Sequence, residues 1–454
     1  MATPRTATVP VPGGAAPGKG IVERLLAPVA DVRHGEVASA LVMTLTMFLL
    51  LSGYYLLKTA REGFILAEGG AEVKSYSSAG QAVLLLALVP AYGSLASRVG
   101  RIQLIQWVTL FFAANLGVFL LALSAGMRIG IVYFLWVGIF NVMVIAQFWG
   151  FAADLYTEEQ GKRLFPLLGV GASLGAWIGS LGAGEIVKTE GPPRLLIGGA
   201  VVLIVCVALA RIANRVTVRG AKAEKQADEK LKEGPSGFSM LLSDRYLTLM
   251  ALLVVVLNVV NSSGEYLFGK YVVNAAIAAH GGGVESEAAR QQFIGETYSS
   301  YFGWVNLIGF LLQMFVVSRV FKFMGVARAL FIHPTVALIG YVGMLFAPSF
   351  GFIRWLKIAD NSLDYSLGNT TKQALWLPTS REAKYKAKQA VDSFCMRAGD
   401  VLQAGVVYAG ELTSMGIAGF AALNLLFVAG WLGVARGLRR KLQTRASAAG
   451  SAEL

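Results

Sequence analysis

Residues 37–57 read VASALVMTLTMFLLLSGYYLL, a run that contains no charged side chain. An α-helix rises about 1.5 Å per residue, so about twenty apolar residues cross the roughly 30 Å hydrocarbon core of a bilayer. The run therefore predicts a membrane-spanning helix. The whole chain has the same character, because 55% of its 454 residues are hydrophobic and only 15% are charged, against about 25% charged in soluble domains.

Eleven further ranges are long and apolar enough to cross a membrane. Together with 37–57, the predicted spans are 73–95, 102–123, 129–153, 164–187, 194–213, 246–268, 297–318, 329–348, 351–375, 389–412 and 416–435. The sequence therefore predicts an all-α membrane protein with twelve transmembrane helices.

Short motifs recur in the same order in the two halves of the chain. Residues 52–57, 97–101 and 157–162 reappear as 263–268, 318–322 and 379–384, at offsets of 211, 221 and 222. One insertion in the loop 274–295 explains the change of offset. We expect two six-helix halves in a parallel repeat, the major facilitator arrangement, in which substrate lies between the halves near the membrane midplane.

Lys and Arg concentrate in every second loop, which accounts for the net charge of +13 without nucleic acid as a partner. Such loops stay in the cytoplasm, so both termini are expected there, in a multi-pass protein of the inner (cytoplasmic) membrane. The expected divisions are a tail with a short surface helix (1–36), an N-terminal half (37–214), a linker (215–245), a C-terminal half (246–436) and a second tail (437–454).

Nothing in the sequence indicates an enzyme or a bound cofactor. The two cysteines, Cys206 and Cys395, fall in apolar spans, and the three histidines lie far apart without metal-ligand spacing. No phosphate-binding loop or nucleophile constellation is present. We expect a monomer without a metal or cofactor.

Ionisable side chains inside predicted spans are costly in lipid and mark candidate substrate sites. Tyr54, Lys58 and Arg61 share one face of the first span, and Glu62 follows. Either the two cations extend from the helix end to the membrane surface, or they face a cavity and bind an anion.

The second half carries its own polar positions. Asn258, Asn261 and Glu265 form a stripe in the seventh span, where Glu265 matches Tyr54 in the repeat. The tenth span is the most polar, with Lys357, Asn361, Asp364 and Lys372 on one face and Tyr365 nearby. In the eleventh span, Arg397 and Asp400 either neutralise each other or contribute to the site.

The buried cations Lys58, Arg61, Lys372 and Arg397 suggest a phosphorylated, polyanionic substrate, because Lys and Arg both bind phosphate. Tyr54 and Tyr365 could stack on a base. Glu62 is a candidate gating residue. The loop charges Lys162, Arg163, Glu382 and Lys384 form inner gates between the halves or are solvated loop faces.

Several motifs resemble the ATP:ADP antiporter family of plastids and obligate intracellular bacteria. DYSLGNTTKQA (364–374) with EAKYKAKQAVD (382–392) resembles its tenth-helix signature, and FWGFA (148–152) its fourth helix. KTARE (58–62) is similar to its basic first-helix motif, and Glu265 stands where the family has a glutamate. Gln373 replaces a usual glutamate.

The resemblance implies a nucleotide transporter, exchanging ATP and ADP or importing nucleoside phosphates by alternating access. It implies phosphate contacts from Lys58, Arg61 and Lys372, with support from Arg397. Glu265 would stay ionised and pair with Lys58 or Lys372, or it would carry a proton, as Asp364 also could. The alternatives are a proton-coupled transporter of another anion and a non-transporting membrane scaffold or sensor.

Overall fold

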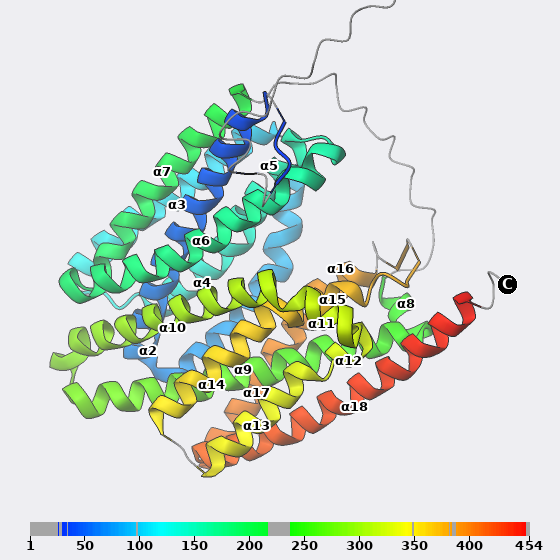
Figure 1. Cartoon of the computed structure of the whole chain (residues 1–454). Coiled ribbons are helices and arrows are strands. Elements are labelled where there is room, and N and C mark those ends of the chain that lie inside the picture. The colour runs from blue at the N-terminus through cyan, green and yellow to red at the C-terminus, as the bar shows by residue number, and fades with distance from the viewer. Residues whose placement is uncertain are drawn as a thin grey trace, which may run out of the picture.

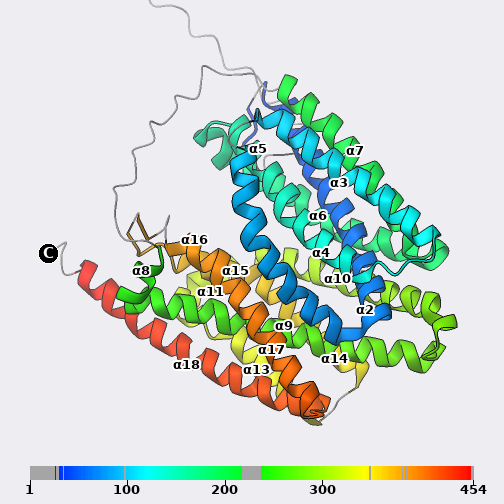
Figure 2. The same ribbon diagram turned by 180° about the vertical axis from the view of Figure 1, so that it is seen from behind.

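A computed structural model describes residues 26, 30–33, 35–96, 99–216, 237–346, 349–380, 382–383 and 387–450. These residues form two helical bundles that lie side by side (Figures 1 and 2). The predicted surface helix within 1–36 and most of the linker 215–245 lie outside the described residues.

The first bundle begins with α2 (Val37–Ala96), a long helix that bends at Gly70. It continues with α3 (Arg101–Ser124), α4 (Gly130–Phe140), a π-helical turn η1 (Asn141–Ile145), α5 (Ala146–Leu155), α6 (Glu158–Glu190) and α7 (Pro193–Val216). Gly70 has φ 74°, a left-handed conformation that glycine adopts without the clash of a Cβ. The bend turns α2 into two antiparallel limbs.

The second bundle is built from helices with more interruptions. These are α8 (Gly237–Ser243), α9 (Arg245–His280), η2 (Val284–Ser286), α10 (Glu287–Phe315), α11 (Val317–Met324), α12 (Val326–Ala329), α13 (Ile332–Phe346), α14 (Phe350–Leu363), η3 (Asp364–Gly368), α15 (Asn369–Ala374), α16 (Lys388–Ala390), η5 (Val391–Cys395), α17 (Met396–Leu412) and α18 (Ile417–Gly450). The turns η3 and η5 are π-helical, a geometry that recurs at functional sites.

Each of the twelve predicted spans falls on a helical part of the described chain. By length and hydropathy alone, eight described helices qualify as membrane spans, or nine if the bent pair α10 and α11 is one span. The all-helical class is confirmed, whereas the count of twelve crossings stays a prediction.

One predicted loop is wrong, because most of the loop expected at 274–295 belongs to α9 and α10. The predicted spans 37–57 and 73–95 are parts of a single helix, α2, which continues through 58–72. A helix can continue past its apolar run, because its backbone hydrogen bonds also form outside lipid. Polar side chains in such a stretch find other partners: the Glu68 carboxylate accepts hydrogen bonds from the amides of Ile129 and Gly130 at 3.3 and 2.7 Å.

Small residues bring α2 and α6 into close contact. Gly171, Gly175 and Gly179 repeat every four residues along α6 and face Thr44, Phe48 and Ser52 of α2. A Cβ at Gly171 would lie 2.7 Å from the Thr44 carbonyl oxygen, and one at Gly179 would lie 2.5 Å from the Ser52 Cα. In a membrane, hydrophobic burial contributes little to helix association, because lipid is itself apolar. Such stripes of small residues stabilise the pair by letting the helix backbones pack closely.

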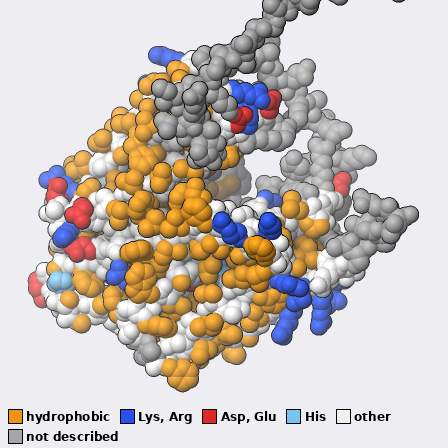
Figure 3. All heavy atoms as spheres, viewed as in Figure 1, with side chains coloured by type: hydrophobic (Ala, Val, Ile, Leu, Met, Phe, Trp, Pro, Cys, Tyr) orange, Lys and Arg blue, Asp and Glu red, His pale blue; other side chains and the backbone are white. Residues whose placement is uncertain are grey.

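The two bundles meet at one end and separate at the other. We call the end with the connections 125–129, 191–192 and 281–286 the loop side, and the end with residues 35–36 and 156–157 the termini side. Between described residues, every hydrogen bond and ion pair that joins the bundles lies at mid-height or toward the loop side. Examples are Arg128 with Glu287 (2.6 Å) and Ser299 with the Ser180 carbonyl (2.8 Å). Figure 3 shows a hollow between the bundles on the termini side.

Candidate functional site

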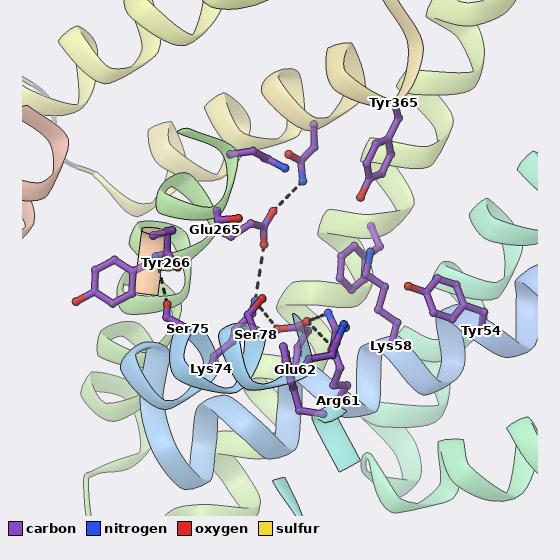
Figure 4. A pocket seen from close by; sticks show the side chains of 17 residues that line it. Tyr54, Lys58, Arg61, Glu62, Lys74, Ser75, Ser78, Glu265, Tyr266 and Tyr365 are labelled. Carbon is purple, nitrogen blue, oxygen red and sulfur yellow. Dashed lines mark hydrogen bonds and ion pairs between the residues drawn. The ribbon is translucent and has the colours of Figure 1, made fainter. Parts of the chain in front are cut away.

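A polar cavity of about 890 Å³ lies between the bundles, and we call it the central cavity (Figure 4). Both limbs of α2 line it from the first bundle, together with Phe134 of α4, and α9, α10, α14, η3 and α17 line it from the second. Its lining residues are Tyr54, Lys58, Arg61, Glu62, Lys74, Ser75, Ser78, Gln81, Phe134, Asn261, Ser262, Glu265, Tyr266, Phe302, Asn361, Tyr365 and Gln403. Lys58 and Arg61 thus face the cavity and not the membrane surface.

Lys58 is surrounded by aromatic rings. Its ammonium lies 4.2 Å from the ring centre of Phe302, 5.2 Å from that of Tyr55 and 5.9 Å from that of Tyr54. Among described residues no carboxylate pairs with it and no acceptor binds it. Cation–π contacts hold a cation without neutralising it. Lys58 therefore keeps an unpaired positive charge for an anion in the cavity.

Arg61 belongs to a buried ion cluster. The Glu62 carboxylate accepts from the Arg61 guanidinium and lies 2.6 Å from the ammonium of Lys74, and the Glu62 side chain is 1% exposed. Lys74 comes from the second limb of α2, so the bend at Gly70 brings the three groups together. Glu62, predicted as a gating residue, therefore lines the central cavity.

Glu265 lies between cations from both bundles. Its carboxylate is 3.7 Å from Lys74 of α2 and 3.7 Å from Lys357 of α14, and it accepts a hydrogen bond from Asn361 at 2.8 Å. The predicted pairing of Glu265 with Lys58 or Lys372 is wrong for this conformation. Lys58 has no ion pair among described residues, and Lys372 pairs with Asp364 at 3.3 Å.

A chain of buried ionisable groups extends from Glu265 into the second bundle. Lys357 donates to Asn261 Oδ1 at 2.6 Å and to Asp360 at 3.0 Å. The other oxygen of Asp360 lies 2.9 Å from Nε2 of His333 on α13. The side chains of Lys357, Asp360 and His333 are only 5–7% exposed. These polar groups are therefore stabilised by their contacts with one another and not by water.

A second cavity of about 1030 Å³ lies next to the first, within the second bundle, and we call it the side cavity. Asn261 and Tyr365 line both cavities. Asp364, Lys372, Asn369 and Asp392 supply its other polar lining, together with Asn258 and Gln373. Apolar residues of α9, η5 and α17, with Leu375 and Trp376, supply the rest. The predicted residues Asp364, Tyr365 and Lys372 thus belong to one connected polar region.

Arg397 lines neither cavity. It pairs with Asp400 at 3.5 Å, and Asp400 also accepts hydrogen bonds from Asn258 (2.8 Å) and Ser262 (3.3 Å). The mutual neutralisation of Arg397 and Asp400 is the alternative that this geometry favours over a phosphate contact.

The predicted gating residues have mixed outcomes. Arg163 pairs with Glu36 of its own bundle at 2.8 Å, so it does not connect the two bundles in this conformation. Partial burial raises the pKa of Glu36, but hydrogen bonds from Arg163, the Arg33 amide and Gln160 outweigh it and leave that pKa below its ordinary value. Glu382 is exposed. The Lys162 side chain and Lys384 lie outside what the structure describes.

Sequence reasoning missed Lys74 and His333 as members of this polar region. Lys74 opens a predicted span and looks like a surface cation, while His333 stands alone in an apolar run. The signal that could have found both is the free-energy cost of placing a charged or polar side chain inside the membrane.

Comparisons with known proteins agree with the fold. A mutant of the nucleoside transporter NupG superposes with a TM-score of 0.61 at 13% identity, covering 88% of this chain and 98% of that one. A bacterial homologue of the iron transporter ferroportin, in an inward-facing state, gives a TM-score of 0.59 at 13% identity, covering 87% and 98%. At such identity these structures show the fold alone, which is that of the major facilitator transporters.

Sequence relatives are more specific. ADP,ATP carrier protein 1 of Chlamydia muridarum is 28% identical over 355 residues, and the plastidic ATP/ADP-transporter of Solanum tuberosum is 24% identical over 337. The matches cover 69% and 66% of this chain, but 65% and 51% of the relatives, so the chain spans less than two thirds of their length. The model of the TLC ATP/ADP transporter family matches residues 193–441, which is more than half of the chain. The chain belongs to the TLC ATP/ADP transporter family.

Proposed function

We propose that this protein is a nucleotide transporter that exchanges ATP and ADP, or imports nucleoside phosphates, by alternating access. The observation that carries the proposal is the unpaired ammonium of Lys58 in a central cavity between two bundles. Membership of a family of ATP/ADP transporters supports the nucleotide as its ligand. We further propose a monomer in a bacterial inner membrane with both termini in the cytoplasm, as the loop cations favour.

The charges of the cavity suggest how a nucleotide would bind. Phosphate oxygens would contact Lys58 first, because within the described part of the chain no carboxylate pairs with it. Arg61 and Lys74 would follow as Glu62 gives up part of its hold on them. Lys372 would act from the side cavity. Tyr365, which lines both cavities and is 46% exposed, offers the most accessible ring for the base.

The alternating motion would exchange contacts between the two ends. In this conformation the loop side is joined by polar contacts, among them Lys270 with Glu72 at 2.7 Å. To open that side, the bundles must break these contacts and form others on the termini side. A non-transporting scaffold needs neither an open cavity nor an unpaired cation, so both features argue against that alternative.

Transport by purified protein in proteoliposomes tests the proposal. Vesicles preloaded with unlabelled ADP are expected to take up radiolabelled ATP, and empty vesicles to take up much less. Thermal unfolding should also shift upward with ATP or ADP, because a ligand of the folded state stabilises it. If neither uptake nor a thermal shift occurs with any nucleotide, the substrate assignment is wrong.

A further inference from the structure

We propose that His333 is a proton-binding site, through which the central cavity takes up a proton together with its anionic substrate. The inference rests on the proposed function only in taking a nucleotide as that anion. It goes beyond that function because His333 contacts neither cavity directly and belongs to none of the residues expected to bind phosphate.

The hydrogen bonds assign the protons around His333. Asp360 accepts from the Lys357 ammonium at 3.0 Å, as an ionised carboxylate does. Such a carboxylate can only accept, so the bond of 2.9 Å to His333 requires a hydrogen on Nε2. In the neutral ring Nδ1 then carries a lone pair, and this nitrogen is buried with no partner among the described residues. The lone pair is a place where one proton can bind.

Gly368 packs beside this nitrogen. A Cβ there would lie 3.2 Å from His333 Nδ1 and 3.2 Å from Asp364 Oδ1, so a larger residue would crowd both side chains. Asp364 lines the side cavity. Gly368 ends the π-helical turn η3, which widens the helix at this point. His333 and Asp364, a residue of the side cavity, thus both lie next to Gly368.

Few other charges surround the imidazole. From α14 it faces Asp360, with Lys357 behind it, and from η3 it faces Asp364, which Lys372 neutralises. From α18 it meets the ring of Trp431, with centroids 4.8 Å apart. The charged residue of α12, Arg328, is exposed and forms no ion pair within the described chain.

The charge balance of the region links this proton to the substrate. With His333 neutral, the three linked groups Lys357, Asp360 and Glu265 of the second bundle sum to −1. In the first bundle, three cations (Lys58, Arg61 and Lys74) and Glu62 sum to +2. A proton on His333 brings the second bundle to zero and raises the total from +1 to +2. An anion in the cavity then binds more tightly, and by linkage it also favours the proton.

The size of the linkage follows from Coulomb's law. His333 is separated from the cavity by three contacts, so a phosphate and the imidazolium would be about 10 Å apart, which at an effective dielectric constant of about 20 corresponds to roughly ten-fold in affinity per charge.

Binding of radiolabelled ADP to purified protein, measured from pH 8 to pH 5.5, tests the inference. The terminal phosphate of ADP titrates in this range too, so the variant comparison isolates the protein. We expect the affinity of the wild type to rise about ten-fold more on acidification than that of His333→Gln. His280→Gln, a change at the loop-side end of α9, should retain the wild-type profile. Equal profiles for wild type and His333→Gln would overturn the proposal.

A measurement on the wild type alone guards against misfolding of the variant. In weakly buffered solution at pH 7.5, where the terminal phosphate of ADP is already almost fully ionised, ADP binding should take up protons from the medium, detected with a pH indicator dye. The absence of proton uptake while ADP binds would also overturn the proposal. If neither ADP nor ATP binds at any pH, the proposed function fails instead.

Discussion

Replacement of Lys58 by alanine should weaken nucleotide binding without unfolding the protein. Among described residues Lys58 has no ion pair, so its removal leaves no carboxylate buried alone, and the rings of Tyr55 and Phe302 lose only a cation–π contact. The lost phosphate contact is a charge-assisted hydrogen bond worth about 1.5–3 kcal/mol. The dissociation constant for ADP should therefore rise about ten- to a hundred-fold.

Equilibrium binding of radiolabelled ADP, with thermal unfolding measured on the same samples, checks this expectation. Lys58→Arg should recover much of the affinity, because a guanidinium also binds phosphate. Lys322→Ala is the matched control, since Lys322 is an exposed cation on α11 away from both cavities. If Lys58→Ala binds ADP as tightly as Lys322→Ala does, the assignment of Lys58 to a phosphate is refuted.

Three further expectations concern packing, pH and topology. Gly175→Ala should lower stability by about 1–3 kcal/mol through overpacking, since its Cβ would lie 2.8 Å from the Phe48 Cα; Gly182→Ala on the same helix, with nothing within 4 Å, should be neutral in thermal unfolding. Glu36→Gln should destabilise the protein at neutral pH, and the difference from wild type should vanish as the pH falls below the lowered pKa of Glu36, because protonation removes the same charge; a difference that persists in acid would contradict this. A cysteine at Lys322 should react with a membrane-impermeant reagent only from the cytoplasmic side, and labelling from outside intact cells would invert the proposed topology.

Hydropathy located the helices because the requirement for apolar side chains in lipid is visible residue by residue. It gave two separate spans, 37–57 and 73–95, where the structure has one helix, because α2 continues through Glu62 and Glu68 to its bend at Gly70. An apolar run indicates only the part of a helix that lipid covers. The ends of the helix are set by backbone geometry and packing, which hydropathy does not report.

The cavity was only partly predictable. Periodicity placed Lys58 and Arg61 on one face, yet it could not tell that Arg61 pairs with Glu62 while Lys58 remains unpaired. That difference depends on Lys74, which the bend in α2 brings within 2.6 Å of Glu62. His333 and Asp360 are far apart in sequence, and only the packing of α13 on α14 shows that they form a hydrogen bond.

The opposite charges of the two cavity walls have a consequence for leakage. Without substrate, the positive wall of α2 and the negative wall around Glu265 attract each other, as the contact of Lys74 with Glu265 shows. If the protein exchanges nucleotides as proposed, the empty carrier would have to work against this attraction to reorient, whereas a bound anion would pair with the cations of α2 and weaken it. The attraction would then limit reorientation without substrate. A carrier that does not reorient when empty would move one substrate molecule out only when another is moved in, and so would prevent net loss of substrate.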